Sequence, residues 1–144
     1  MSGILWLVIA ASLLVACYTD CRTCEVYNVI WWVSGTAAAL SMILNGKVTI
    51  AMVLELGVFC LIQLLLFSRM YGKADCYAFC VCAMAETACG MGFPEYLFHM
   101  VFAFGILAMV QLARQNVNSK GNLKHPVPFL PYITMGFVLV LLFF

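Results

Sequence analysis

Charged residues are scarce in this chain. Asp, Glu, Lys and Arg make up 9% of its 144 residues, whereas a soluble domain contains about 25%, and 66% of the residues are hydrophobic. This small number of charged residues cannot cover the surface of a soluble protein. The composition therefore excludes a soluble enzyme. With a formal net charge of only +1, we expect a lipid bilayer, and no nucleic acid, as the partner.

Strict alternation of polar and apolar residues is also missing, which excludes membrane-spanning strands, while abundant Leu, Met and Ala favour helices. A bilayer core about 30 Å thick takes roughly 20 mostly apolar residues per helix. The sequence therefore predicts an all-α membrane protein, a six-transmembrane-helix bundle in which residues 1–144 form one domain. The six apolar stretches are 3–19, 27–45, 48–68, 76–93, 96–113 and 127–144.

A lipoprotein signal is the alternative for the first stretch, because "LVAC" (Leu14 to Cys17) resembles a lipobox that ends at the lipidated cysteine. Secretory signals normally begin with a positively charged segment, and "MSGILW" has none. We therefore expect a membrane helix here.

Basic residues predict the orientation. If the six helices alternate in direction, six basic residues lie on one side of the membrane and only Lys47 lies on the other. By the positive-inside rule the first side is cytoplasmic, so both termini are outside. The six residues are Arg22, Arg69, Lys73, Arg114, Lys120 and Lys124.

Aspartate is rarer still, because the chain contains only Asp20 and Asp75. Asp20 ends the first predicted helix and Asp75 begins the fourth, so we expect both at the cytoplasmic boundary and at similar depth. A structural explanation is open for each: Asp75 suits the first turn of a helix, and Asp20 can sit in interfacial water beside Arg22. Against it, the only two aspartates share one depth and one face.

Two carboxyl groups held close together have a defined chemistry. They do not both ionise easily, so one stays protonated and the other charged. The charged group takes a proton from water, which attacks a peptide carbonyl, and the protonated group donates to the carbonyl oxygen. This is aspartyl proteolysis, and it requires neither a metal nor a cofactor.

"TDCRTCEVYN" resembles the first motif of type IV prepilin peptidases and archaeal preflagellin peptidases. In that family an Asp at the end of a membrane helix is followed by a basic residue and then by Ile-Pro-Asn. Asp20, Arg22, Val26 and Asn28 match in place, whereas Tyr27 stands where the family has Pro.

Two further segments extend this resemblance over the whole chain. "GKAD" (Gly72 to Asp75) resembles the family's Gly-x-Gly-Asp motif, and "HPVPFLPYITMGF", which contains Pro128, resembles the start of its last helix. Ala74 replaces the second Gly of the motif, and Tyr77 replaces a frequent Lys. An Ala at position 74 is unfavourable if the backbone there needs a positive φ.

The resemblance implies an intramembrane aspartic-type endopeptidase that cleaves the leader of a prepilin-like protein at the cytoplasmic face of the cell membrane, in type IV pilus assembly or protein secretion. The soluble zinc-binding insert of large family members is absent, so it implies a minimal peptidase. Asp20 and Asp75 would be catalytic. The residues expected to support them or to position substrate are Arg22, Asn28, Gly72, Lys73, Ala74 and Pro128.

Eight cysteines allow a different function. Cys21 and Cys24 have the spacing of a redox pair, so a membrane thiol-disulfide oxidoreductase is one alternative, and a non-catalytic membrane scaffold is another. Zinc binding by these two with Cys17 and Cys76 is also conceivable. We expect the cysteines to fill helix contacts instead, because the predicted orientation places this pair in a reducing compartment.

Glu55 and Glu86 are expected at matched depth on consecutive helices, so we predict that they lie within hydrogen-bonding distance of each other or of one polar cavity. His99 is expected to be a packing residue. The aromatic residues of "NVIWWV" fit an interfacial belt. The basic cytoplasmic face does not suit a basic leader, and anionic lipid is its expected counter-charge.

Overall fold

Six α-helices and one short 3-10 helix follow one another in the computed structural model, which describes residues 2–117 and 127–144. No strand occurs in these ranges, so the predicted all-α class and the order of the six helices are confirmed. The elements are α1 (Ser2–Thr23), α2 (Asn28–Asn45), α3 (Ile50–Leu65), η1 (Phe67–Arg69), α4 (Lys73–Ala88), α5 (Phe93–Val117) and α6 (Leu130–Phe143).

The helices differ in how well they suit a bilayer. Three segments are long and apolar enough to cross one: Gly3–Thr23, Ile50–Arg69 and Phe93–Arg114. Helix α6 is apolar but shorter, and α4, with 16 residues, is only about 24 Å long. Length and composition thus support three of the six predicted spans.

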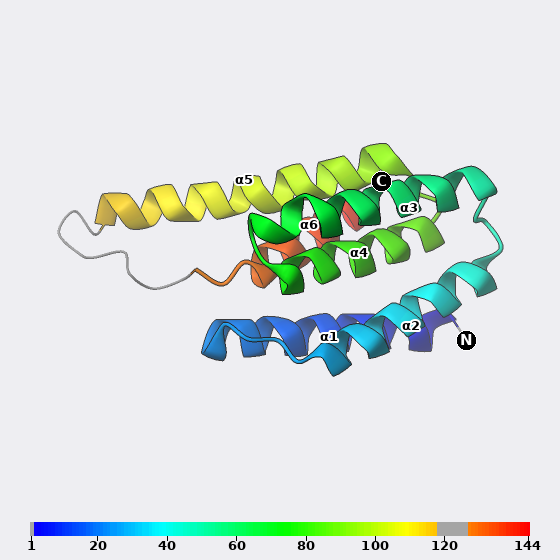
Figure 1. The fold of residues 1–144 in the computed structure, drawn as a ribbon, viewed down its shortest axis with the longest axis horizontal. Coiled ribbons are helices and arrows are strands. Elements are labelled where there is room, and N and C mark those ends of the chain that lie inside the picture. The colour runs from blue at the N-terminus through cyan, green and yellow to red at the C-terminus, as the bar shows by residue number, and fades with distance from the viewer. Residues whose placement is uncertain (1, 118–126) are drawn as a thin grey trace.

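Successive helices run in opposite directions, and both chain ends lie at the same end of the bundle (Figure 1). Helices α4 and α6 lie between the α1–α2 pair and the helices α3 and α5 (Figure 1), and α4 contacts α2, α3, α5 and α6. Arg22, Arg69, Lys73 and Arg114 fall at the end where α1 stops, and Lys47 lies at the other. Lys120 and Lys124 are outside the described residues.

Helix α4 is the core of the bundle because its side chains are small. Ala and Cys recur along "KADCYAFCVCAMAETA", and ten of its 16 residues are buried. Small residues let helix backbones approach closely in membrane proteins, where packing replaces the hydrophobic effect as the driving force. The surface facing outward is apolar instead, with Leu, Ile, Val and Phe side chains exposed on every helix except α4.

Candidate functional site: a cavity between two aspartates

Asp20 lies in the last turn of α1 and is only 8% exposed. Helix α1 ends where Cys24 takes the left-handed conformation (φ 52°), and the Cys24 N–H donates to the Asp20 carbonyl oxygen at 3.0 Å. The Asp20 Oδ2 accepts a hydrogen bond of 3.1 Å from the backbone N–H of Leu130, the first residue of α6. Asp20 therefore caps α6. The alternative that Asp20 sits in interfacial water beside Arg22 is wrong.

Asp75 occupies the first turn of α4 and is half-buried. The residue before the helix, Gly72, has φ 105° and ψ 157°, a conformation that side chains disfavour. A Cβ at Gly72 would lie 3.7 Å from the Asp75 Oδ2, so the glycine packs against the carboxyl group. No side chain accepts a capping hydrogen bond at the start of α4, so Asp75 is not its cap.

Both carboxyl groups line one cavity of about 330 Å³, called the aspartate cavity below. It lies where α1 ends and where α4 and α6 begin, with α5 completing the wall. The lining residues are Asp20, Cys24, Tyr71, Asp75, Phe104, Leu107, Val127, Pro128 and Phe129.

The two carboxyl groups have different surroundings. Burial, and secondly the negative charge of Asp20, raise the pKa of Asp75 to about 7. Among the described residues, no hydrogen-bond donor is within reach of the Asp75 carboxyl group, whereas Asp20 accepts the Leu130 N–H at a helix N-terminus, where negative charge is favoured. With a pKa of about 7, Asp75 is partly protonated near neutral pH, and of the two carboxyl groups only Asp20 accepts a backbone N–H.

Tyr71 also lines the cavity, and the sequence analysis missed it. Its hydroxyl donates to the side-chain oxygen of Gln63, which is fully buried on α3, and its ring packs edge-on against Phe79, Phe104 and Phe129. Burial raises the pKa of Tyr71, so its hydroxyl stays neutral and keeps the hydrogen that it donates to Gln63. The sequence feature that could have indicated a polar partner for Tyr71 is Gln63, a single polar residue within the apolar run "LGVFCLIQLLLF".

Of the expected supporting residues, Pro128 lines the cavity and Gly72 touches Asp75. Lys73 is the exposed first residue of α4, and Ala74 follows it in the helix. The positive φ of this motif falls on Gly72, so Ala74 takes helical geometry without strain.

Arg22 and Asn28 are not brought into this cavity. Arg22 is exposed, and its guanidinium lies 5.2 Å from the centre of the Tyr18 ring. Asn28 begins α2 and lines a different cavity, with Trp31, Trp32 and Tyr77. The structure gives neither residue a contact with Asp20 or Asp75.

All eight cysteines are free, and both Cys21 and Cys24 are exposed. In residues 2–117 and 127–144, no three His, Cys, Asp or Glu side chains are placed to hold a metal ion. The set of thiols considered for zinc is therefore not gathered at one point. Cys17 instead makes a 3.1 Å hydrogen bond with Thr134 of α6.

The predicted pairing of Glu55 with Glu86 is wrong. Glu86 is fully buried and lies 2.8 Å from Nδ1 of His99 on α5. Glu55 Oε2 accepts the Phe93 N–H at 2.9 Å, at the start of α5. Helical spacing placed the two acids at one depth, but the sequence does not show that His99 stands closer to Glu86.

Comparisons with family models, curated proteins and solved structures find no match to this chain.

Proposed function

We propose that this chain is an intramembrane aspartyl endopeptidase, with Asp20 and Asp75 as its catalytic pair. The observation that carries the proposal is that the only two aspartates, 55 positions apart in the sequence, line the same cavity and one has a pKa raised to about 7. An acid and a base with separated pKa values in one cavity are what aspartyl proteolysis needs.

The surroundings of each carboxyl group assign its role. Asp20, whose carboxylate form is favoured by the Leu130 N–H, takes a proton from water as the water attacks the scissile carbonyl carbon. Asp75, whose pKa of about 7 leaves part of it protonated at neutral pH, donates its proton to the carbonyl oxygen. Tyr71, whose hydroxyl donates to Gln63, lines the same cavity and leaves its hydroxyl oxygen as an acceptor toward substrate.

The proposed substrate follows from the resemblance to prepilin peptidases and from where the cavity lies. The cavity is at the end of the bundle that carries most of the basic residues, which is the cytoplasmic end by the positive-inside rule. A leader joined to an apolar helix would present its junction at this depth. We therefore propose six crossings of the cell membrane, both termini outside, and cleavage of a prepilin-like protein at the cytoplasmic boundary.

The decisive experiment is cleavage of a prepilin-like substrate in membranes by Asp20→Asn and Asp75→Asn variants. Each should lose activity by at least about a thousandfold, with the loss in turnover and little change in substrate binding. Asn retains an oxygen that accepts the Leu130 N–H, so Asp20→Asn keeps the α6 cap and the fold. The double variant should be no worse than either single one.

Glu25→Gln is the matched control, because Glu25 is an exposed acid at the same end of the bundle. It should cleave like the wild type. Full activity of either Asn variant would end the peptidase proposal and leave the Cys21–Cys24 redox function or a non-catalytic scaffold.

A further inference from the structure

Gln63, in the last turn of α3, is a fully buried amide within an apolar segment. It is not one of the described residues that line the aspartate cavity. Polar side chains within membrane helices are costly to bury, and they are usually kept for the groups that they bond. The partners of Gln63 therefore indicate its role.

Two hydrogen bonds reach Gln63 from either side of Asp75. The Tyr71 hydroxyl donates to the side-chain oxygen of Gln63. The thiol of Cys76, the residue after Asp75 on α4, donates to the backbone carbonyl oxygen of Gln63 at 3.2 Å. That carbonyl group is in the last turn of α3, where carbonyl oxygens have no N–H donor within the helix. Gln63 thus holds the chain four positions before Asp75 and one position after it.

The turn that carries Asp75 depends on these bonds. Gly72, with φ 105°, precedes α4, and no side chain caps the helix there. The Asp75 carboxyl group lies against Gly72 and has no hydrogen bond of its own among the described residues. Its position therefore follows from the backbone, which Tyr71 and Cys76 hold against α3 through Gln63.

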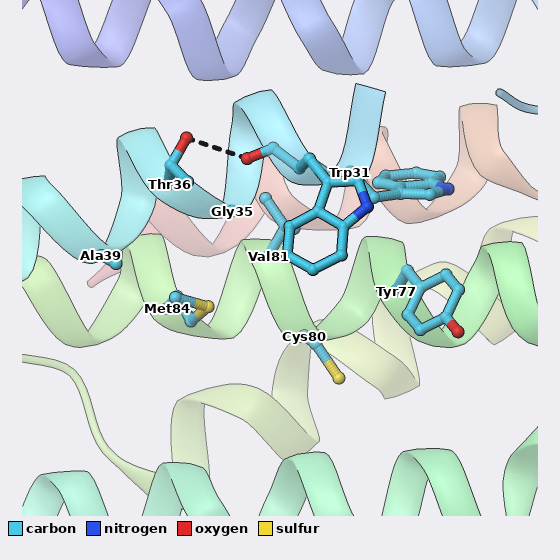
Figure 2. A pocket seen from close by; sticks show the side chains of 9 residues that line it. Trp31, Gly35, Thr36, Ala39, Tyr77, Cys80, Val81 and Met84 are labelled. Carbon is cyan, nitrogen blue, oxygen red and sulfur yellow. Dashed lines mark hydrogen bonds between the residues drawn. The ribbon is translucent and has the colours of Figure 1, made fainter. Parts of the chain in front are cut away.

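Helix α4 presents different faces to α2 and to α3 (Figure 2). Tyr77 lies beside a hollow between α2 and α4, whereas the Cys80 side chain points away from α2. Cys76 lies one helical turn before Cys80 and so on the same face. The Cys80 thiol is hydrogen-bonded to Cys60 of α3. The face toward α3 thus has two thiol contacts one turn apart, and the one next to Asp75 is made to Gln63.

We propose that Gln63 is a positioning residue of the aspartate cavity, which holds Tyr71 and Cys76 against α3 so that Asp75 stays in the same cavity as Asp20. Its effect on cleavage rests on the proposed peptidase function, whereas its effect on Asp75 does not. Loss of the Gln63 side-chain oxygen frees the turn. Water then reaches Asp75 more easily and Asp20 is no longer held near it, and both changes favour the charged form of Asp75.

Carbon-13 NMR of the purified protein in detergent micelles tests this without a substrate. Because the chain contains only two aspartates, aspartate labelled at the γ-carboxyl carbon gives two signals, and Asp20→Asn leaves only that of Asp75. The wild-type Asp75 signal should titrate with a midpoint near pH 7. Gln63→Met keeps the length of the side chain but removes its oxygen, and should lower this midpoint by about one pH unit. Gln63→Glu retains an oxygen that accepts the Tyr71 hydroxyl, so its midpoint should stay at or above the wild-type value.

Three further variants serve as comparisons. Gln111→Met makes the same change at an exposed position of α5 and should titrate like the wild type. Cys76→Ala should lower the midpoint by less than Gln63→Met does, because a thiol is a weak donor. Cys80→Ala should leave it unchanged, because the Cys80 thiol bonds a different residue of α3. Circular dichroism verifies that each variant is folded, and Cys76→Ala decides the question if Gln63→Met does not fold.

Cleavage of a prepilin-like substrate gives a second readout. Turnover by Gln63→Met should fall about tenfold with little change in KM, because a displaced acid slows the chemical step more than it weakens binding. Gln63→Glu should retain most of the wild-type turnover. A wild type that cleaves no such substrate would contradict the proposed function, and the NMR titration would still decide the role of Gln63.

Two results would overturn the proposal. An unchanged midpoint in folded Gln63→Met and Cys76→Ala would make Gln63 a packing residue of α3. Equal downward shifts in Gln63→Met and Gln63→Glu would mean that the oxygen bonded by Tyr71 does not hold the turn.

Discussion

At the scale of single residues, the two aspartates show how position decides the behaviour of one residue type. The side chain of Asp20 is less exposed to solvent than that of Asp75, but its carboxylate accepts a hydrogen bond from a backbone N–H at the start of α6. Asp75 is more exposed, lies against Gly72 and is affected by the negative charge of Asp20. The Leu130 hydrogen bond favours the charged form of Asp20 against the burial that opposes it, whereas no such bond offsets the burial of Asp75.

The raised pKa of Asp75 predicts how stability depends on pH. Its ordinary value is 3.8 and its value in the folded protein is about 7. Between these values the folded state keeps a proton that the unfolded state releases, so the free energy of unfolding should fall as pH rises from about 4 to about 7. Thermal unfolding in detergent at pH 5 and pH 8 measures this fall.

Asp75→Asn should reduce this pH dependence, and Glu25→Gln should leave it unchanged. The rate of substrate cleavage should decline above about pH 7 for the same reason, because Asp75 then loses the proton that it donates. An identical pH dependence of stability in Asp75→Asn and the wild type would contradict the assignment of the proton to Asp75.

At the scale of helices, α6 depends on residues far away in the sequence. Phe129, which precedes it, provides no cap, and Asp20 fills this role from 110 positions earlier. Its other close contact is with α5, because Gly136 lies directly against the α5 backbone. A helix whose end and face are both fixed by other elements holds Val127, Pro128 and Phe129 in place at the aspartate cavity.

Gly136→Ala should destabilise the protein by about 1–3 kcal/mol, the usual cost of adding a methyl group to a packed interior. The added Cβ would lie 3.0 Å from His99 Cδ2 and 3.1 Å from the Ala103 nitrogen, so α5 and α6 would have to separate. Gly57→Ala on α3 is the control, since its Cβ meets nothing and alanine favours a helix by about 0.5–1 kcal/mol. Unfolding in detergent measures the stability of both variants. Equal stability of Gly136→Ala and the wild type would disprove the close contact between α5 and α6 at Gly136.

The helices were predictable because local composition determines them, and the contacts between them were not. Apolar runs and polar breaks predicted six helices in the right order, and the two aspartates were rightly expected at a helix end and a helix start. The cap that Asp20 gives α6 and the contact of Glu86 with His99 join positions that no local pattern relates. Gly72 was noticed through a motif, but its positive φ became visible only in the structure.

At the scale of the whole molecule, a polar pair ties the inner helices together. His99 Nε2 lies 2.8 Å from the Ile133 carbonyl oxygen, which only accepts, so this nitrogen carries a hydrogen. His99 Nδ1, the other ring nitrogen, lies 2.8 Å from Glu86 Oε1 on α4. Helices α4, α5 and α6 are thus joined by a buried polar pair that fixes how they pack against one another.

The distribution of charge along the bundle makes orientation testable. Cys21 is exposed near Arg22, at the end that holds the aspartate cavity. Cys89 is exposed where α4 ends, near Lys47 at the opposite end. The proposed cleavage at the cytoplasmic boundary requires the first end to be inside the cell, since the leader of the substrate is made there.

A membrane-impermeant maleimide applied to intact cells should therefore label a variant whose only cysteine is Cys89. A variant whose only cysteine is Cys21 should be labelled only after the membrane has been opened. A variant that retains only Cys82, which is fully buried, is the control and should react only after denaturation. The opposite pattern, with Cys21 labelled from outside, would place Asp20 and Asp75 on the external face. A peptidase in that orientation could not reach the junction between a cytoplasmic leader and its apolar helix. The prepilin-like substrate proposed for the aspartate cavity would then be wrong, even if the cavity itself hydrolyses peptides.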